Sequence, residues 1–246
     1  MLINTIIYFI FYFVFGACIG SFLTMAMYRI PNNEDLIFLD SHCPNCGVKL
    51  KARSLIPIFS YLIQGGKCLN CKQPISIRYL LIELVNTIVY VSLFFAFGVG
   101  FKSIFLGLVF STIFLIMLID FKYKEIPIVA TIALFILSII HILFNPIDVL
   151  YAFLSAFVYF ALIKIAVKIL QLRKKDVQFL GGGDEKLIII CGLFLTMRYF
   201  NIFYIITGVL GVVSALLWQA IFKEKEFPFG PAILVSLYTL LLYYYW

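Results

Sequence analysis

Two aspartates stand apart from the other acidic residues of this 246-residue chain because each adjoins a long apolar segment. Asp120 closes the run Phe114–Asp120, and Asp184 follows three glycines in the run Phe179–Leu187. Two carboxyl groups that meet cannot both ionise, so one can activate water while the other keeps a proton and polarises a scissile carbonyl. Asp120 and Asp184 are therefore predicted to be a catalytic acid/base pair.

The glycines before Asp184 have a use in such a site. Gly181 and Gly183 allow unusual backbone angles and the close approach of an extended substrate. They also let a helix begin late, which places Asp184 near a helix N-terminus. Two plainer interpretations stay open: Asp120 could form an i,i+4 surface pair with Lys124, and Asp184 could simply cap a helix.

Four cysteines occupy the longest polar stretch of the chain. They form two C-x-x-C pairs, Cys43/Cys46 and Cys68/Cys71, with 21 residues between the pairs. This pattern predicts a tetrahedral zinc site in which all four ligands are thiolates, so its role would be structural. The spacing lies just beyond the usual range for such sites. Two disulfides or an empty site are the alternatives, and a cytosolic location favours metal.

The composition defines the elements that must position these residues. Hydrophobic residues make up 64% of the chain and charged residues 13%, which excludes a soluble enzyme and a disordered chain. Long unbroken apolar runs exclude a β-barrel and predict an all-α polytopic membrane protein embedded in a lipid bilayer. The net charge of +7 is attributed to cytosolic loops rather than to nucleic acid, which is not an expected partner.

Eight apolar runs predict about eight transmembrane helices. The run at 186–197 is short, which leaves seven spans as the alternative. The runs are residues 4–28, 79–99, 103–120, 126–144, 147–170, 186–197, 201–222 and 228–246.

Basic residues gather in alternate loops, which predicts that the cysteine loop and both aspartates face the cytosol and that both termini face outward. We expect three parts: a first transmembrane helix at 1–29, a cytosolic zinc-ribbon-like domain with four cysteine ligands at 30–78, and a helix bundle at 79–246 that carries the aspartates. The cysteine domain is too small for an ordinary core, so a metal would supply its stability.

Several short motifs follow one another in order along most of the chain. The first is Gly20–Pro31, and the last is Phe229–Pro231. Between them lie Cys43–Cys46, Ile56–Leu62, Gly66–Cys68, Cys71, Ile75–Tyr79, Glu83, Asp120 with Pro127, and Gly181–Lys186.

Together these motifs resemble the type IV prepilin peptidases, bacterial membrane aspartyl proteases. The resemblance implies a hydrolase of the GxGD type in the bacterial cytoplasmic (inner) membrane. It would cut the leader from prepilins and pseudopilins of type IV pilus or type II secretion systems, before their hydrophobic N-terminal helix. It also implies Lys186 as a residue that shapes the site. Many members then methylate the new N-terminus with S-adenosylmethionine, so N-methyltransferase activity is expected here too.

Gly20, Ser21 and Glu83 are candidates for contacts with substrate or S-adenosylmethionine. The plainer interpretation is helix packing for Gly20 and Ser21 and a helix-terminal charge for Glu83. Other functions also stay open for the whole chain. A transporter would need ionisable residues within the membrane, and a non-catalytic assembly factor would need only the zinc loop. Another GxGD-type protease would explain the aspartates but not the cysteines.

Overall fold

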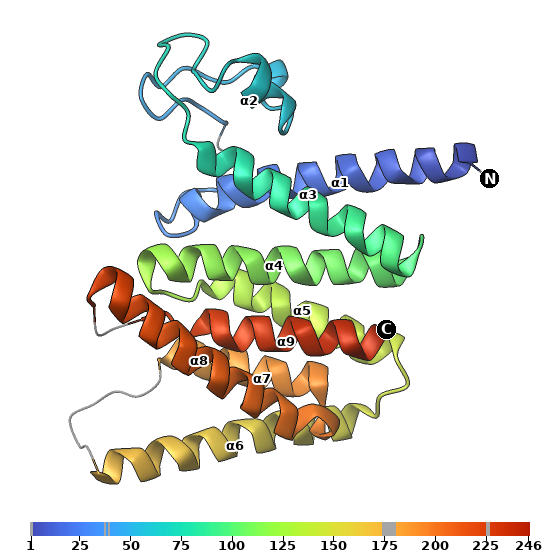
Figure 1. Ribbon diagram of the computed structural model, residues 1–246, viewed down its shortest axis with the longest axis vertical. Coiled ribbons are helices and arrows are strands. Elements are labelled where there is room, and N and C mark those ends of the chain that lie inside the picture. Colours follow the sequence, from blue (N-terminus) through green and yellow to red (C-terminus); the bar gives the residue numbers. More distant parts are fainter. Residues whose placement is uncertain (1, 37, 39, 174–180, 225–226) are drawn as a thin grey trace. The chain divides into compact units, whose positions relative to one another are not determined.

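The computed structural model describes residues 2–36, 38, 40–173, 181–224 and 227–246. In this part of the chain, each predicted apolar run forms one main helix (Figure 1). The main helices are α1 (Leu2–Arg29), α3 (Ile77–Phe97), α4 (Phe101–Tyr123), α5 (Ile128–Phe144), α6 (Val149–Arg173), α7 (Gly182–Leu195), α8 (Phe200–Phe222) and α9 (Gly230–Tyr245). The single-turn helices are η1 (Ala52–Ser54), α2 (Phe59–Ile63) and η2 (Met197–Tyr199).

The helices differ in their ability to cross a bilayer. Within the described residues, α1, α3, α4, α6 and α8 are long and apolar enough to do so. Helices α5 and α9 are apolar but shorter, and α7 has 14 residues. At 1.5 Å per residue α7 is about 21 Å long, less than the roughly 30 Å of a hydrocarbon core. The chain is a multi-pass membrane protein, and the short helices depend on their neighbours for burial.

Local sequence signals fix where these helices begin and end. The Ser76 hydroxyl accepts a hydrogen bond from the backbone N–H of Arg78 at 3.4 Å and caps α3, as serine does at helix starts. Gly98 ends α3 with a left-handed φ of 73°. Pro127 precedes α5 and Pro231 lies in the first turn of α9, where a missing N–H costs nothing.

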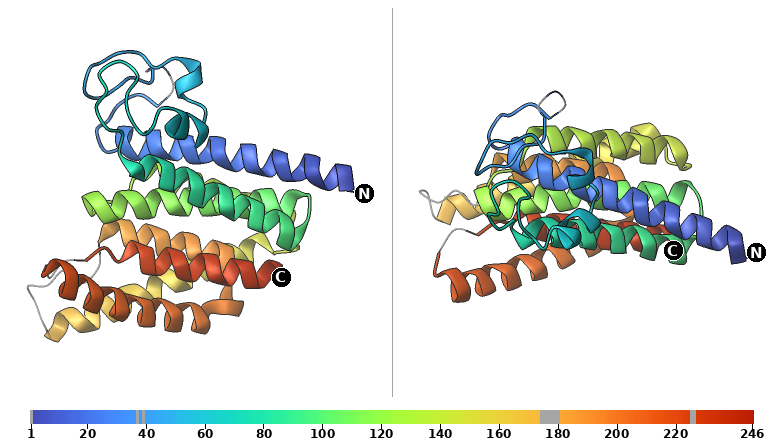
Figure 2. Two further views of the ribbon diagram at one scale, coloured as in Figure 1. Left: turned by 45° about the horizontal axis from the view of Figure 1, so that its top comes forward. Right: turned by 90° about the horizontal axis from the view of Figure 1, so that it is seen from above.

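The chain divides into two compact units, Met1–Ser111 and Thr112–Trp246, with the boundary inside α4. In the first unit α1 and α3 lie side by side in all views (Figures 1 and 2). The segment between them, residues 30–76, forms a separate small lobe that contains α2 and the four loop cysteines. We call it the cysteine lobe.

Two glycines four residues apart allow α1 to approach α3 closely. A methyl group on Gly16 would lie 2.9 Å from Cβ of Tyr90, and one on Gly20 would lie 2.8 Å from Cα of Glu83. Small residues at this spacing are typical of tight helix pairs in membranes. Asn86 adds a polar tie between the helices, because its amide donates to the Gly16 carbonyl at 2.8 Å.

The second unit is built around α7. Helix α7 packs against α5, α6 and α9, and α8 packs against α9. Its residues Leu187, Ile188, Cys191 and Leu193 are all buried, as expected of a helix that is apolar on every side. Gly192 lets α6 approach, since a methyl group there would lie 2.6 Å from Cα of Ala156. The short α7, which is buried from Leu187 to Leu195 apart from the half-buried Ile189, carries Asp184 at its more exposed start.

Candidate functional site

Asp120 lies one turn before the end of α4 and is 4% exposed. Its Oδ2 atom is buried and has no hydrogen-bond partner among the described residues. The same oxygen lies against the start of α9, where a methyl group on Gly230 would be 2.6 Å from it. A buried carboxylate oxygen without a partner is costly, so Asp120 has the features of a functional rather than a structural residue.

Asp184 occupies the first turn of α7. Its Oδ2 accepts a hydrogen bond from the backbone N–H of Gly181 at 3.3 Å, so the predicted helix-start position is correct. The prediction of unusual glycine angles is wrong, because Gly181 has φ −75° and ψ 151° and Gly183 is helical. Gly183 instead permits close packing: a methyl group there would lie 2.8 Å from Cβ of Ile126.

One side chain, Ile126, contacts both aspartate-bearing regions. It lies against Gly183, next to Asp184, and its Cδ1 lies 3.5 Å from the position of a Cβ on Gly230. The Asp120 carboxyl group lies against Gly230, so it is next to the same isoleucine. Asp120 and the start of α7 therefore approach one side chain from helices far apart in sequence. This arrangement can share one proton between an acid and a base.

The structure contradicts the plainer interpretation of Asp120 and agrees with that of Asp184. Lys124 pairs with Glu224, with Nζ and Oε2 2.7 Å apart, so it does not pair with Asp120. Asp184 does satisfy a backbone N–H at a helix start, and this role is compatible with a second one. Lys186 is exposed on α7, whereas the neighbouring Glu185 pairs with Lys164 of α6 at 2.6 Å.

The four loop cysteines gather into one cluster. Their Sγ atoms all lie within 4.8 Å of one another. None forms a disulfide, and Sγ of Cys43 is 3.9 Å from Sγ of Cys71. A zinc ion about 2.3 Å from each sulfur would hold the sulfurs about 3.8 Å apart. The cluster could therefore bind a metal ion, and the disulfide alternative is not realised.

The two C-x-x-C turns have the same backbone hydrogen bonds. Gly47 donates its N–H to the carbonyl of Cys43 at 2.9 Å, and Lys72 donates to that of Cys68 at 3.0 Å. Both donors are left-handed, with φ 68° at Gly47 and 58° at Lys72. Isolated β-bridges flank the turns at His42–Lys49 and Lys67–Pro74.

N–H groups directed at the sulfurs favour thiolates. The backbone of Val48, followed by the side chain of Asn70, lowers the pKa of the Cys46 thiol to about 6. The Asn70 amide lies 3.7 Å from that sulfur. Backbone N–H groups of Cys71 and Asn70 likewise lower the pKa of Cys68. Because thiolates are the metal-binding form, these contacts suit metal ligation.

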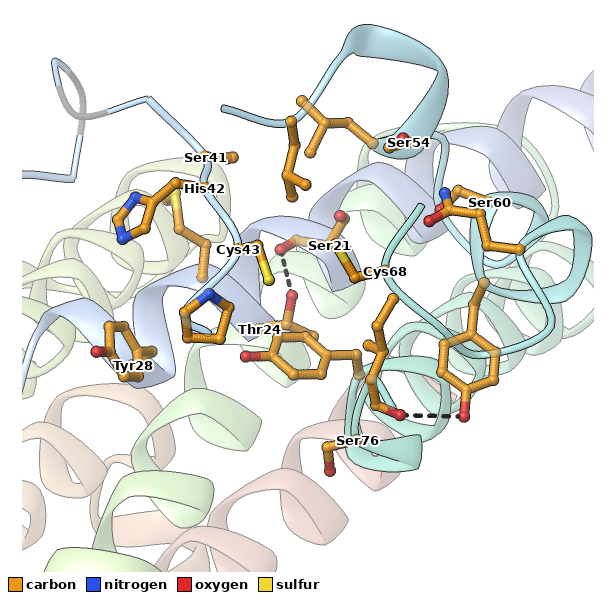
Figure 3. A pocket seen from close by; sticks show the side chains of 18 of the residues that line it. Ser21, Thr24, Tyr28, Ser41, His42, Cys43, Ser54, Ser60, Cys68 and Ser76 are labelled. Atoms are coloured by element: carbon orange, nitrogen blue, oxygen red, sulfur yellow. Dashed lines mark hydrogen bonds between the residues drawn. The ribbon is translucent and has the colours of Figure 1, made fainter. Parts of the chain in front are cut away.

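A cavity of about 420 Å³ lies between the cysteine lobe and the adjoining ends of α1 and α3. Nine of its 24 lining residues carry a hydroxyl group, and Figure 3 shows several of them together with Cys43 and Cys68. Cavities of about 300–1,000 Å³ with a few convergent polar groups are typical of small-molecule sites. The labelled hydroxyl residues are Ser21, Thr24, Tyr28, Ser41, Ser54, Ser60 and Ser76.

The three predicted contact residues differ in whether they line this cavity. Ser21 and Glu83 line the cavity. Gly20 does not: it packs against α3, as its plainer interpretation states. Glu83 is 8% exposed and lies in the second turn of α3, so it is a buried carboxylate rather than a helix-terminal surface charge.

Comparison with known proteins agrees with both parts of this geometry. Residues 14–97 match the bacterial peptidase A24 N-terminal domain, and residues 105–216 match the type IV leader peptidase family. A prepilin leader peptidase/N-methyltransferase of Bacillus subtilis is 32% identical, with 90% of this chain and 88% of that protein aligned. The chain belongs to the type IV leader peptidase family.

Other members give the same result. The protein of the same name from Neisseria gonorrhoeae is 31% identical over 91% of this chain and 86% of its own length. That of Vibrio cholerae is 27% identical over 94% of both chains. No solved structure matches this chain significantly. The resemblance seen in the motifs is thus confirmed at the level of the family.

Sequence reasoning missed several residues of this family member's site. Ile126 carried no signal, because an isoleucine before a proline is ordinary in a loop. Gly230 was noticed only as part of a motif, and its contact with Asp120 depends on folding. Ile58 was unremarkable in sequence, yet it is a buried β-branched residue with a φ of 63°.

The residue that a transporter would offer has a structural role. His141 is fully buried, and its Nδ1 lies 2.8 Å from the Tyr245 hydroxyl. The Asn145 amide also donates to that hydroxyl, at 3.0 Å. These contacts tie α5 to the end of α9.

Proposed function

We propose that this chain is a membrane aspartyl endopeptidase that removes the N-terminal leader of type IV prepilins and pseudopilins. One observation carries the proposal: Asp120 is buried with an unpartnered carboxylate oxygen, and Ile126 links its surroundings to the start of α7, which bears Asp184. The relatives from Neisseria gonorrhoeae and Bacillus subtilis bear the name prepilin leader peptidase/N-methyltransferase. Asp120 and Asp184 are the proposed catalytic residues.

The chemistry follows from the pair. The ionised carboxylate takes a proton from water as the water attacks the scissile carbonyl, and the protonated carboxyl donates to the carbonyl oxygen. As the C–N bond breaks, the carboxyl that took the proton from water gives it to the departing amine, and the other carboxylate takes a proton back from the gem-diol. Because Gly230 and Gly183 lack side chains, they leave room for these groups to meet. Gly181 holds the start of α7. Lys186 remains a proposed site-shaping residue.

The substrate class follows from the location of the pair. A prepilin or pseudopilin whose apolar helix lies in the bilayer would present its leader junction where that helix leaves the membrane. The distribution of basic loops supports a cytosolic location, at the bacterial inner membrane, for that junction, the aspartates and the cysteine lobe. This sidedness is part of the proposal.

Methylation of the new N-terminus is assigned to the first unit. The hydroxyl-lined cavity of about 420 Å³ is large enough for S-adenosylmethionine, which supplies the methyl group when bound. The hydroxyls of Ser21 and its neighbours can bind the polar parts of such a ligand. The names of the relatives from Neisseria gonorrhoeae and Vibrio cholerae include both activities.

Zinc is the metal proposed for the cysteine cluster. Four thiolates at tetrahedral spacing would hold it through Cys43, Cys46, Cys68 and Cys71, with no position left for water. The ion would therefore stabilise the lobe that walls the cavity and take no part in cleavage.

A cleavage assay tests the proposal directly. Purified protein in detergent is mixed with a model prepilin, and wild type is compared with Asp184→Ala. Mass spectrometry reads the N-terminus of the product. We expect cleavage by wild type alone, and a product heavier by one methylene group when S-adenosylmethionine is present. A folded, metal-loaded wild type that does not cut would favour an assembly factor or a different substrate helix.

A further inference from the structure

A strained turn lies directly behind the wall of the cavity. Ile58 has φ 63° and ψ −57°, and the N–H of Phe59 donates to the carbonyl of Pro57 at 2.6 Å. This is a γ-turn with positive φ, a rare conformation that costs a β-branched residue more than most. Such outliers persist only where the surroundings enforce them, and they often mark functional sites.

The enforcing group is Glu83. Its Oε2 accepts a hydrogen bond from the N–H of Ile58 at 2.7 Å in a buried setting. Glu83 in turn lies against α1, because its Cα packs on Gly20. The turn is therefore tied through the Glu83 carboxylate to the point where α3 packs on α1.

The turn leads straight into a wall of the cavity. Helix α2 begins at Phe59, and its residues Ser60 and Tyr61 line the cavity together with Gln64 just beyond it. Tyr61 also donates its hydroxyl to the carbonyl of Ile75 at 3.4 Å. A turn that relaxed at Ile58 would change the direction of α2 and move these side chains.

We propose that Glu83 is a positioning residue for methyl transfer, which holds the Pro57–Phe59 turn in its strained form and so sets the α2 wall of the cavity. Its carboxylate acts through Ile58 and not through a direct contact with the methyl donor or acceptor. This inference rests on the proposed methyltransferase function. It assigns to Glu83 a different role from the ligand contact expected from the sequence.

A double-mutant cycle tests the inference. Glu83→Met keeps the volume and removes the acceptor, while Ile58→Gly allows the same backbone angles without strain. With Ile58 present, Glu83→Met should weaken S-adenosylmethionine binding and methylation by roughly tenfold or more, the range for loss of a hydrogen bond to a charged group. In the Ile58→Gly background, the same substitution should cost less than about threefold.

Two further readouts separate positioning from contact. Amide hydrogen exchange over residues 55–63 should rise in Glu83→Met with no ligand present, whereas loss of a ligand contact would leave it unchanged. Glu83→Gln retains an acceptor oxygen and should keep most of the binding. Equal losses with and without the Ile58→Gly substitution, or a loss in Glu83→Gln as large as in Glu83→Met, would overturn the inference.

The proposed function can fail separately. Wild type that cleaves a prepilin but neither binds nor methylates with S-adenosylmethionine would refute the methyltransferase function itself. In that case the exchange measurement still tests whether Glu83 holds the turn. Cleavage by the same preparations reports that the second unit is folded in every variant.

Discussion

The two units handle buried polar groups in opposite ways. In the first unit the Oε2 atom of the buried Glu83 carboxylate accepts a hydrogen bond from the N–H of Ile58. In the second unit the buried Oδ2 atom of Asp120 has no hydrogen-bond partner among the described residues, and Gly230 lies against it. A carboxylate oxygen with a partner stabilises its surroundings, whereas one without a partner stays available for a substrate or a proton. The contrast fits the proposed roles of Glu83 in positioning and of Asp120 in catalysis.

The units also differ in what surrounds their sites. Hydroxyl-bearing, apolar and cysteine side chains together line the cavity of the first unit. Apolar helices surround the aspartates of the second, and Ile126 contacts both Gly183 and Gly230 there. A cavity with several polar side chains suits a soluble cofactor, and an apolar frame suits a carboxyl pair that must share a proton. The two proposed activities should therefore be separable by mutation.

The largest expected effect concerns the aspartates. Asp120→Asn or Asp184→Asn should lower prepilin cleavage by about a thousandfold or more, because each removes one half of an acid/base pair. Methylation of a peptide that already has the mature N-terminus should be unchanged. Glu185→Gln, next to Asp184 but paired with Lys164, is the matched control and should retain cleavage. If the Asn variants also lost methylation, the two activities would not be separable by mutation.

The next effect concerns the metal cluster. Cys68→Ser, or a strong chelator, should expose the loop to proteolysis and abolish methylation, because metal binding supplies folding energy in small lobes. Cleavage should fall much less. Cys18→Ser is the control, since Cys18 is exposed on α1 and outside the cluster. Limited proteolysis with metal analysis makes the measurement, and unchanged resistance in Cys68→Ser would argue against a structural metal.

A smaller effect is expected from a single methyl group. Gly230→Ala would place Cβ 2.6 Å from the Asp120 Oδ2 atom, so the carboxyl group must move. A shift of this size should cost roughly tenfold to a hundredfold in cleavage. Gly208→Ala in α8 meets nothing within 4 Å and should be neutral or slightly stabilising. Equal activities of the two variants would mean that the contact with Gly230 is unimportant.

The smallest expected effect is a shift in the pH at which metal is lost, and it should differ between the two turns of the cysteine cluster. Asn70 donates to the Cys46 sulfur at 3.7 Å and helps to lower its pKa to about 6. In Asn70→Ala this pKa rises, so protons compete better for the thiolate and metal is lost at a higher pH than in wild type. Asn45→Ala, at the corresponding position of the other turn, should shift the midpoint less. Cobalt absorption titrated from pH 8 to 4 would measure both.

The helices and the gathering of the four loop cysteines could be predicted from sequence, for clear physical reasons. Eight apolar runs became eight helices because bilayer length and backbone hydrogen bonding leave few alternatives. The four cysteines met because paired C-x-x-C turns present their sulfurs in the same way. Asp184 was expected at a helix start, and α7 begins two residues before it.

What failed depends on contacts between distant segments. The glycines at 181–183 were expected to adopt unusual angles, but Gly183 serves close packing against Ile126. The packing of Gly20 on the α3 backbone could be stated from sequence only as an alternative to a ligand contact. The positive φ of Ile58 could not be read from its residue type, because the contact of its N–H with Glu83 joins residues 25 positions apart.

The cysteine cluster has an inner and an outer face. Cys43 and Cys68 are each 6% exposed, whereas Cys46 is exposed and Cys71 partly so. An oxidant or a competing chelator therefore meets the second cysteine of each turn first. Release of an ion would proceed in two stages: the outer sulfurs detach while the inner pair still joins the turns, and the lobe opens only after the second stage. The order in which the cysteines react with an alkylating reagent would record that sequence.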